Sequence, residues 1–385
     1  MFLEDLLILL VLVWISRKVF QCLRLPSLFG EVFAGVIAGP LILGVVHETE
    51  AIKVLSELGI FLLMFHAGLE THPQDLLKSS KRAGVVAFGG ALLSILGAYF
   101  VGISFGYSRM TSLFMGLALA ITAVAISARL FKDNKLMRTR VAHTVMGAAV
   151  MTEVFILIAI SVLLDLNETG QFDLSHLMTD LAKFVGYFAM VFILAHFVFK
   201  KYLYRIIYKG NKGFTFSIIL ALALAVLAES IGLHFIIGAF LAGLFLSGEL
   251  FDEGVFNKIE DRTFGISYSF LAPIFFATLA FHLDFSALHT VPVFMGLILF
   301  VSLVGKVIGS GVPAYFFGMN KVESLGVGLA MNSRGAVELI VAAIGLEAGI
   351  IDAQIFSVLV LISFATTLIS ILGMKPIAHK LKHKS

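Results

Sequence analysis

Long apolar runs separated by short polar segments form the dominant pattern of this chain. Charged residues, Gly and Pro interrupt the runs at intervals that fit membrane-spanning helices, which need about 20 apolar residues. We predict thirteen helices, at 3–20, 28–46, 52–70, 83–105, 110–130, 139–164, 177–199, 213–231, 234–249, 264–283, 291–317, 322–346 and 352–373. The connecting segments are too short for a soluble domain. The pattern therefore predicts an all-α polytopic membrane protein.

Composition supports this class. Of 385 residues, 59% are hydrophobic and only 14% are charged, far from the balance of soluble domains. The first apolar run begins with Glu4 and Asp5 and ends at Arg17 without a small-residue cleavage site, so we interpret it as a retained helix. The single Cys22 excludes an internal disulfide, and no Cys and His spacing predicts a metal cluster.

Basic residues are distributed unevenly between the two sides. If the carboxyl terminus is cytoplasmic, 23 of the 28 Lys and Arg fall on the inner side, as the positive-inside rule requires. The outer side keeps Lys53, Arg109 and Lys183, and two more, Lys306 and Arg334, fall inside helices. We therefore predict an amino terminus outside. Because the basic residues are dispersed over many loops, they do not indicate nucleic-acid binding.

Short sequence phrases recur at a nearly constant separation. Three equivalent pairs lie 208, 214 and 212 residues apart: Gly35 and Gly243, Glu70 and Asp284, and Gly116 and Gly328. This offset corresponds to seven helices, an odd number, so it predicts two inverted six-helix repeats joined by a linker helix, a plan of secondary transporters. Chance similarity between Gly-rich apolar helices is the alternative.

A single carboxylate stands out in the sixth predicted helix. Glu153 is the only charge between Val141 and Leu164. A charge at mid-membrane costs several kcal/mol and usually faces a cavity or a partner, so Glu153 is the first functional candidate. The alternative is a structural Glu paired with a Lys or Arg.

Polar residues interrupt the repeat-related helices 110–130 and 322–346. The segments Ala120–Ser127 and Met331–Glu338 predict crossed discontinuous helices that line a cavity, with Ala123, Asn332 and Ser333 in the lining. Thr122 and Ser127 either contact an ion or bond to the preceding turn of their own helix.

Three further charges lie in the second repeat. Arg334 and Glu338 are four residues apart, so they can pair on one helix face, and a structural pair is favoured over a direct transport role. Lys306 has no carboxylate three or four residues away. Its partner must come from another helix, and we expect Glu153.

Four phrases together resemble the monovalent cation:proton antiporter-2 family, with a likeness from about Pro26 to Gly349: Glu57–Phe65 with Gly68-Leu69-Glu70, Ile237–Gly243, Pro273–Phe276 and Met331–Glu338. The family includes bacterial sodium/proton antiporters, potassium efflux systems and plant cation/proton exchangers. The resemblance implies a homodimer in the bacterial inner membrane, surrounded by lipid and without a cofactor. It implies scaffold helices at 1–82 and 213–290, mobile core helices at 83–164 and 291–385 with a basic cytoplasmic tail, and a linker at 165–212.

The resemblance also assigns site residues. Glu153 matches the carboxylate that carries the ion or proton, Lys306 the core lysine, and Arg334 the arginine of the broken helix. Thr152 stands where sodium/proton members have Asp and potassium efflux members have Gln. Because Thr152 cannot be a counter-ion, Lys306 either pairs with Glu153 or is less tethered, and the charge moved per cycle stays open.

We therefore predict an antiporter in which Glu153 binds either Na⁺ or K⁺ or a proton, with oxygen ligands from Thr152 and the Thr122 region. The cycle is electroneutral if only Glu153 changes occupancy. Two alternatives remain, a partner-gated potassium efflux pathway and a non-transporting ion sensor. The efflux branch usually carries an appended nucleotide-binding domain. We do not expect one in this chain, because the sequence up to Ser385 shows no such domain. An enzyme is not expected, since no nucleophile–base set or phosphate loop is visible.

Overall fold

A computed structural model describes residues 2–23, 25–71, 81–169, 182–183, 186–191, 193, 212–247 and 253–382. Every regular element in these ranges is a helix. Within them, eight helices are long and apolar enough to cross a membrane, and two shorter apolar helices span Ser27–Ala38 and Phe235–Ser247. The chain is thus an all-helical, multi-pass membrane protein, as the sequence predicts. Most of the expected helix 177–199 lies outside the described residues.

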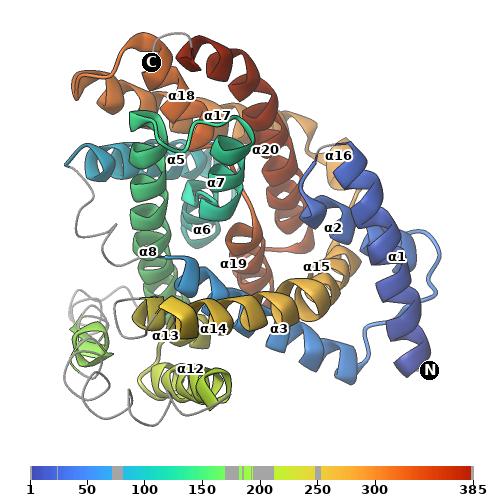
Figure 1. The fold of residues 1–385 in the computed structure, drawn as a ribbon. Helices are drawn as coiled ribbons and strands as arrows, with labels where there is room; N and C mark the ends of the chain where they lie inside the picture. Colours follow the sequence, from blue (N-terminus) through green and yellow to red (C-terminus); the bar gives the residue numbers. More distant parts are fainter. Residues whose placement is uncertain are drawn as a thin grey trace. The chain divides into compact units, whose positions relative to one another are not determined.

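The chain forms two compact units, each built from two separate stretches of sequence (Figure 1). Unit 1 comprises residues 1–75 and 164–281, and unit 2 comprises 76–163 and 282–385. The helices of unit 1 are α1 (Phe2–Cys22), α2 (Ser27–Ala38), α3 (Glu50–Glu70), α12 (Lys212–Ser230), α13 (Phe235–Ser247), α14 (Glu253–Ile266), the π-helical turn η2 (Ser267–Leu271) and α15 (Ala272–Leu279).

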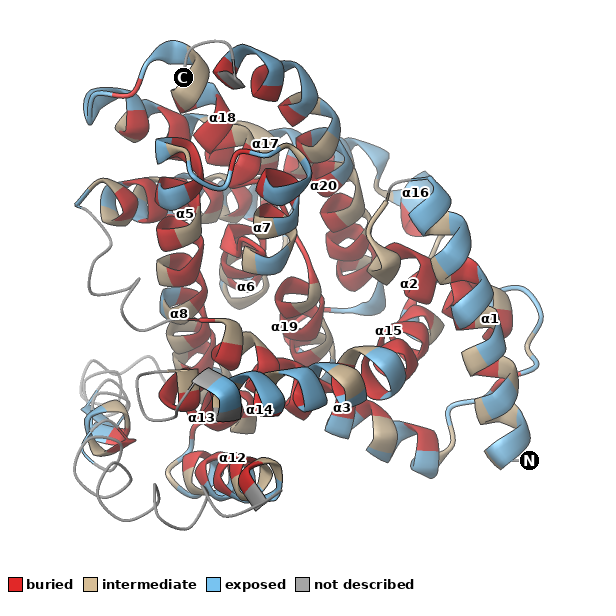
Figure 2. Ribbon diagram, viewed as in Figure 1, coloured by how far each residue is buried: buried red, intermediate tan, exposed pale blue. Residues whose placement is uncertain are grey.

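Unit 2 contains most of the remaining helices. They are α5 (Lys81–Ser104), α6 (Arg109–Ala120), α7 (Val124–Asp133), the short α16 (Ala287–Thr290), α17 (Pro292–Phe316), α18 (Lys321–Ala330), α19 (Ala336–Glu347) and α20 (Ala353–Lys382). α8 (Arg140–Thr169) begins in unit 2 and ends in unit 1. Figure 2 shows that α19 is buried over most of its length.

Several predicted helix boundaries are wrong. The helix expected at 28–46 ends at Ala38, because Gly39 is extended (φ −77°, ψ −171°) before Pro40, which disfavours helical geometry in the preceding residue. The helix expected at 264–283 begins instead at Glu253 and continues through η2 into α15. Its first turns are amphipathic rather than apolar, so hydropathy alone missed them.

The basic tail expected after residue 373 is also largely helical, since α20 continues to Lys382. Met374, Ile377, Ala378 and Leu381 belong to the buried cluster of unit 2. Their spacing of three and four residues gives this segment an apolar face, and packing of that face extends the helix.

The buried cluster of unit 2 fixes the first half of α8. Val141, Val145 and Ala148 form a stripe on α8 and share the cluster with residues of α5, α7, α18 and α20. Thr152 continues this stripe by one more turn. Apolar packing therefore determines which way this part of α8 faces, including the residues next to the candidate carboxylate.

The structure contains contacts that recur 212 positions apart. Gly106 and Gly318 both have positive φ (85° and 81°) and stand two residues before the N-caps Ser108 and Asn320 of α6 and α18. Farther along the same helices, a Cβ on Gly116 would lie 2.8 Å from the carbonyl oxygen of Ile95, and one on Gly328 would lie 2.6 Å from that of Val307. Equivalent turns and contacts thus support the repeat offset read from the sequence.

Glycines set a very close contact between α3 and α13 in unit 1. A Cβ on Gly243 of α13 would lie 2.0 Å from the carbonyl oxygen of Phe65, and one on Gly68 of α3 would lie 2.0 Å from that of Phe240. Such distances are possible only between bare backbones, as in other membrane helix pairs with small residues at the interface.

We expect Gly243→Ala to lower the free energy of unfolding by about 1–3 kcal/mol, because α3 and α13 must separate to admit the methyl group. Gly265→Ala is the matched control, since a Cβ there meets nothing within 4 Å, and Ala favours helix by up to about 1 kcal/mol. The measurement is thermal unfolding in detergent, followed by circular dichroism. Equal unfolding midpoints for the two variants would contradict the packing argument.

Candidate functional site

Two helices of unit 2 are interrupted at related positions. Residues 121–123 separate α6 from α7, and residues 331–335 separate α18 from α19. Both interruptions fall where the sequence has polar residues inside apolar runs. Each interruption leaves backbone N–H and carbonyl groups without partners inside its own helix, and an apolar interior requires that they be satisfied elsewhere.

The two interruptions supply hydrogen-bond partners to each other. The backbone N–H of Ala123 donates to the carbonyl oxygen of Ser333 at 2.8 Å. The Thr122 hydroxyl donates to the carbonyl oxygen of Met331 at 2.9 Å, and the Ser127 hydroxyl to that of Ala330 at 3.3 Å. Bonding of these two hydroxyls to their own preceding turn, one alternative from the sequence, is therefore wrong. They join one broken helix to the other.

Lys306 of α17 is fully buried and lies at the end of α6. Its ammonium donates to the carbonyl oxygen of Ala120 and, at 2.8 Å, to the hydroxyl oxygen of Thr122. Ala120 is the last residue of α6, and helix carboxyl ends carry partial negative charge that stabilises a cation. The hydrogen-bond partners of Lys306 are thus a carbonyl and a hydroxyl oxygen from outside α17. Its pairing with Glu153 stays a prediction.

Arg334 and Glu338 form an ion pair between two side chains with 0% exposure. Arg334 Nη1 donates to Glu338 Oε1 at 2.8 Å, and Arg334 Nη2 donates to the hydroxyl of Ser302 on α17. The hydroxyl of Thr367 on α20 accepts from the Arg334 backbone N–H and donates to the Arg334 carbonyl, both at 2.9 Å. This broken helix is therefore fixed by two neighbouring helices.

Ser302 and Thr367 were not among the residues predicted from the sequence. Ser302 had a signal, because it precedes Lys306 by four residues and Ser310 follows by four more, which puts all three on one face of α17. Ser310 donates to the carbonyl oxygen of Val86 on α5 at 3.3 Å. Thr367 is one of several buried hydroxyl residues of α20, and nothing in the sequence separates it from the others.

Glu153 and Thr152 are buried in α8, with 3% and 1% exposure. The Thr152 hydroxyl donates to the carbonyl oxygen of Ala148 at 2.8 Å, which leaves its oxygen lone pairs available to accept or to bind a cation. Thr122 is more occupied, because its hydroxyl accepts from Lys306 and donates to Met331.

The second interruption holds further buried oxygen atoms. The Asn332 side-chain amide donates to the carbonyl oxygens of Gly328 at 3.3 Å and Leu303 at 3.4 Å. Asn332 Oδ1 and Ser333 Oγ are buried and have no hydrogen-bond partner among the described residues. Oxygen atoms of this kind suit hard cations or water better than apolar contacts do.

The buried formal charges of unit 2 balance. Among the described residues of this unit, the buried acidic and basic side chains are Glu153, Glu338, Lys306 and Arg334. Lys306 and Arg334 stand 212 positions after the uncharged Ser94 and Thr122, so the two basic residues belong to one repeat only. Glu338 has a basic partner on its own helix. Glu153 is the second buried carboxylate of this unit.

We expect Glu338→Gln to destabilise the protein by about 3–5 kcal/mol, because Arg334 would stay buried without a counter-charge. The double variant Arg334→Met/Glu338→Met should recover most of that loss, since an apolar pair of similar volume removes both charges. Thermal unfolding in detergent measures both. The exposed Glu347 of the same helix supplies the control Glu347→Gln, for which no change is expected. A Glu338→Gln variant as stable as this control would refute the role of the pair.

Known proteins resemble this chain over most of its length. The family model described as sodium/hydrogen exchanger, transmembrane, matches residues 6–380. The chain is 30% identical to a probable Na⁺/H⁺ antiporter, GerT, of Bacillus cereus, over 94% of this chain and 95% of the relative. It is also 30% identical to a Na⁺/H⁺ antiporter of Enterococcus hirae, over 97% of each. A Na⁺/H⁺-K⁺ antiporter of Bacillus cereus, GerN, is 29% identical over 90% of this chain and 88% of the relative.

A solved structure shares the fold. The sodium proton antiporter MjNhaP1 of Methanocaldococcus jannaschii matches with a TM-score of 0.78 at 19% identity, over 98% of both chains. The match supports the all-helical architecture.

Proposed function

This chain belongs to the sodium/hydrogen exchanger family, and from that premise we propose that it exchanges a monovalent cation, Na⁺ or K⁺, for protons by alternating access. The resemblance seen in the sequence is thereby confirmed at the level of the family. The family consists of transporters, not enzymes, whose cargo is cations and protons and which need no cofactor. The observation that carries the proposal is the burial of Glu153 in the same compact unit as the two mutually bonded helix interruptions.

In the proposed cycle, Glu153 holds one occupant at a time. A cation requires the ionised carboxylate, and protonation removes the charge that holds the cation. The hydroxyl of Thr152 and the buried oxygens of Asn332 and Ser333, all in the same unit, are the ligand types that could complete the shell of a hard cation. Lys306 maintains the end of α6 and the position of Thr122.

A single exchanging carboxylate implies an electroneutral cycle. With Glu153 ionised, the four buried charges sum to zero, and adding either Na⁺ or a proton gives the same net charge of +1. If only Glu153 changes occupancy, exchange of one cation for one proton moves no net charge. Thr152 contributes no charge, whereas an Asp there would add a second titratable group.

The same proposal includes an architecture. It has thirteen helices in two inverted six-helix repeats, with α6–α7 and α18–α19 as the crossed discontinuous helices. We assign unit 1 to the scaffold and unit 2 to the mobile core of an elevator mechanism, in a homodimer in the bacterial inner membrane. The amino terminus lies outside and the carboxyl terminus in the cytoplasm, in agreement with the distribution of basic residues.

We expect Glu153→Gln to reduce exchange to the level of protein-free liposomes, because the amide neither binds a proton nor attracts a cation. The measurement is dissipation of an imposed pH gradient in proteoliposomes when sodium or potassium is added. Glu153→Asp, which keeps the carboxylate, should retain exchange at a higher cation concentration, and the exposed Glu347→Gln should match wild type. Normal exchange by Glu153→Gln would remove this residue from the mechanism. Saturable cation binding to wild type without flux would indicate the sensor alternative.

We expect the rate and end point of exchange to be independent of membrane voltage. If each cycle moved one net charge, 100 mV would shift the equilibrium by about 2.3 kcal/mol, or about 50-fold. Proteoliposomes with a potential set by an ion gradient unrelated to the transported cation and an ionophore provide the test, and Thr152→Asp provides a comparison with a second carboxylate. A large voltage effect on wild type would refute the electroneutral stoichiometry and leave the antiport proposal intact.

A further inference from the structure

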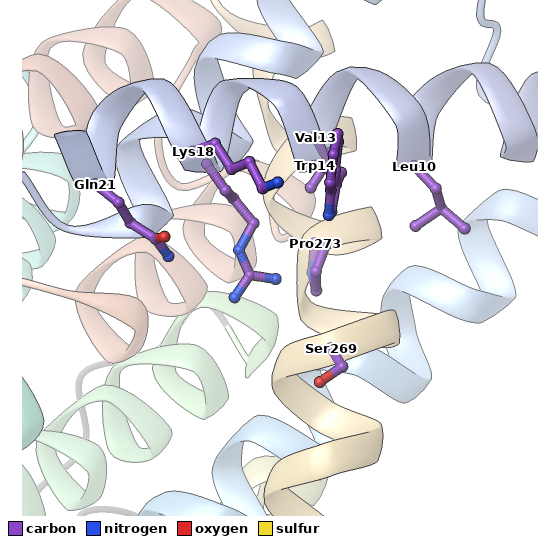
Figure 3. Close-up of a pocket in the computed structure, with 8 residues that line it drawn as sticks. Leu10, Val13, Trp14, Lys18, Gln21, Ser269 and Pro273 are labelled. Carbon is purple, nitrogen blue, oxygen red and sulfur yellow. The ribbon is translucent and has the colours of Figure 1, made fainter.

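Unit 1 contains a pocket lined by residues that the transport proposal does not use. The pocket, of about 380 Å³, lies between α1 and the helix formed by η2 and α15 (Figure 3). Its polar lining is Arg17, Lys18, Gln21 and Ser269, and its apolar lining includes Trp14 and Pro273. Figure 3 shows Lys18 and Gln21 on α1, with Ser269 and Pro273 on the facing helix. The pocket thus joins a cationic end to an apolar wall.

The π-helical turn explains why Arg17 is held at this place. Pro273 has no N–H to donate, and the N–H of Ala272 bonds to the carbonyl of Ser267, five residues earlier. The carbonyl of Tyr268 is therefore released from the helix ladder, and Arg17 Nη1 donates to it at 2.9 Å. Arg17 Nε lies 3.3 Å from Oε1 of the buried Glu31 on α2. These contacts fix the guanidinium at the pocket.

Lys18 supplies the net positive charge of the pocket. Glu31 balances the charge of Arg17, whereas the Lys18 ammonium lies 3.8 Å from the centre of the Trp14 ring, in a cation–π contact. Lys18, Trp14 and Gln21 are exposed. A cation held above an indole near a helix end is typical of the membrane–water interface.

We propose that this pocket binds the phosphate headgroup of an anionic phospholipid. Lys18 provides charge for the phosphate, while Gln21, Ser269 and the outer edge of Arg17 provide hydrogen-bond donors. The wall formed by Leu10, Val13 and Trp14 runs along α1 from Lys18 toward the middle of the helix, which the predicted topology puts among acyl chains. The orientation predicted from the basic residues puts this end of α1 on the cytoplasmic side, whose leaflet is rich in anionic lipid. A lipid satisfies both the charged and the apolar part of the pocket, and a free phosphate satisfies only the first.

The test compares thermal unfolding of the delipidated, full-length protein in detergent with added phosphatidylglycerol, phosphatidylcholine or inorganic phosphate. Phosphatidylglycerol should raise the unfolding midpoint of wild type in a saturable manner, and the other two should not. Lys18→Gln should need about fivefold more phosphatidylglycerol for the same shift, because one basic residue is lost at the surface. Lys258→Gln is the matched control, since Lys258 is an exposed lysine of unit 1 on the same predicted side. Lys18→Arg, which keeps the charge, should behave as wild type.

Three results would overturn the proposal. Equal responses of Lys18→Gln and Lys258→Gln to phosphatidylglycerol would exclude this pocket as the lipid site. A shift reproduced by inorganic phosphate alone would indicate a free-anion site. A change in oligomeric mass of Lys18→Gln, with its lipid response intact, would indicate that a second copy of the chain covers the pocket. None of these measurements depends on ion exchange, so they are independent of the proposed transport function.

Discussion

An apolar interior does not tolerate unpaired backbone groups, and the core of unit 2 is organised by that constraint. Its two helix interruptions would each be unfavourable alone. Together they are stable, because the N–H of Ala123 reaches Ser333, the hydroxyl of Thr122 reaches Met331, and Lys306 reaches the carbonyl end of α6. Each interruption thus depends on the other for its hydrogen bonds, and a substitution in one will disturb the hydrogen bonds of the other.

This mutual dependence assigns different tasks to the buried charges. Lys306 holds a helix end, and Arg334 holds Glu338. Glu153 belongs to α8, whose apolar stripe packs in the same buried cluster as Ala330 and Met331, the residues at the second interruption. In the proposed exchange, the variable charge therefore lies on a helix that shares a buried cluster with this interruption, while the other buried charges hold the interrupted helices.

The sequence predicts those features that depend on residue type and period. Hydropathy identified most helices, polar residues identified the interruptions, and the spacing of Arg334 and Glu338 predicted their pairing. The partners of Lys306 could not be predicted, because a carbonyl such as that of Ala120 has no signature in the residue that carries it. Thr367 was missed for a related reason, since its role depends on which turn of α20 meets Arg334. The early start of α14 was missed because amphipathic turns at a membrane surface have low mean hydropathy.

The two repeats of unit 2 have equivalent turns and contacts, but Lys306 and Arg334 are both in the second repeat, where the first has Ser94 and Thr122. In the proposed inverted arrangement, the two halves would exchange environments when the access side changes, and identical halves would give two end states of equal energy. Halves that differ in charge would make these states unequal, so the empty protein would rest on one side of the membrane and bind cations with different affinity at its two faces, even without any regulator.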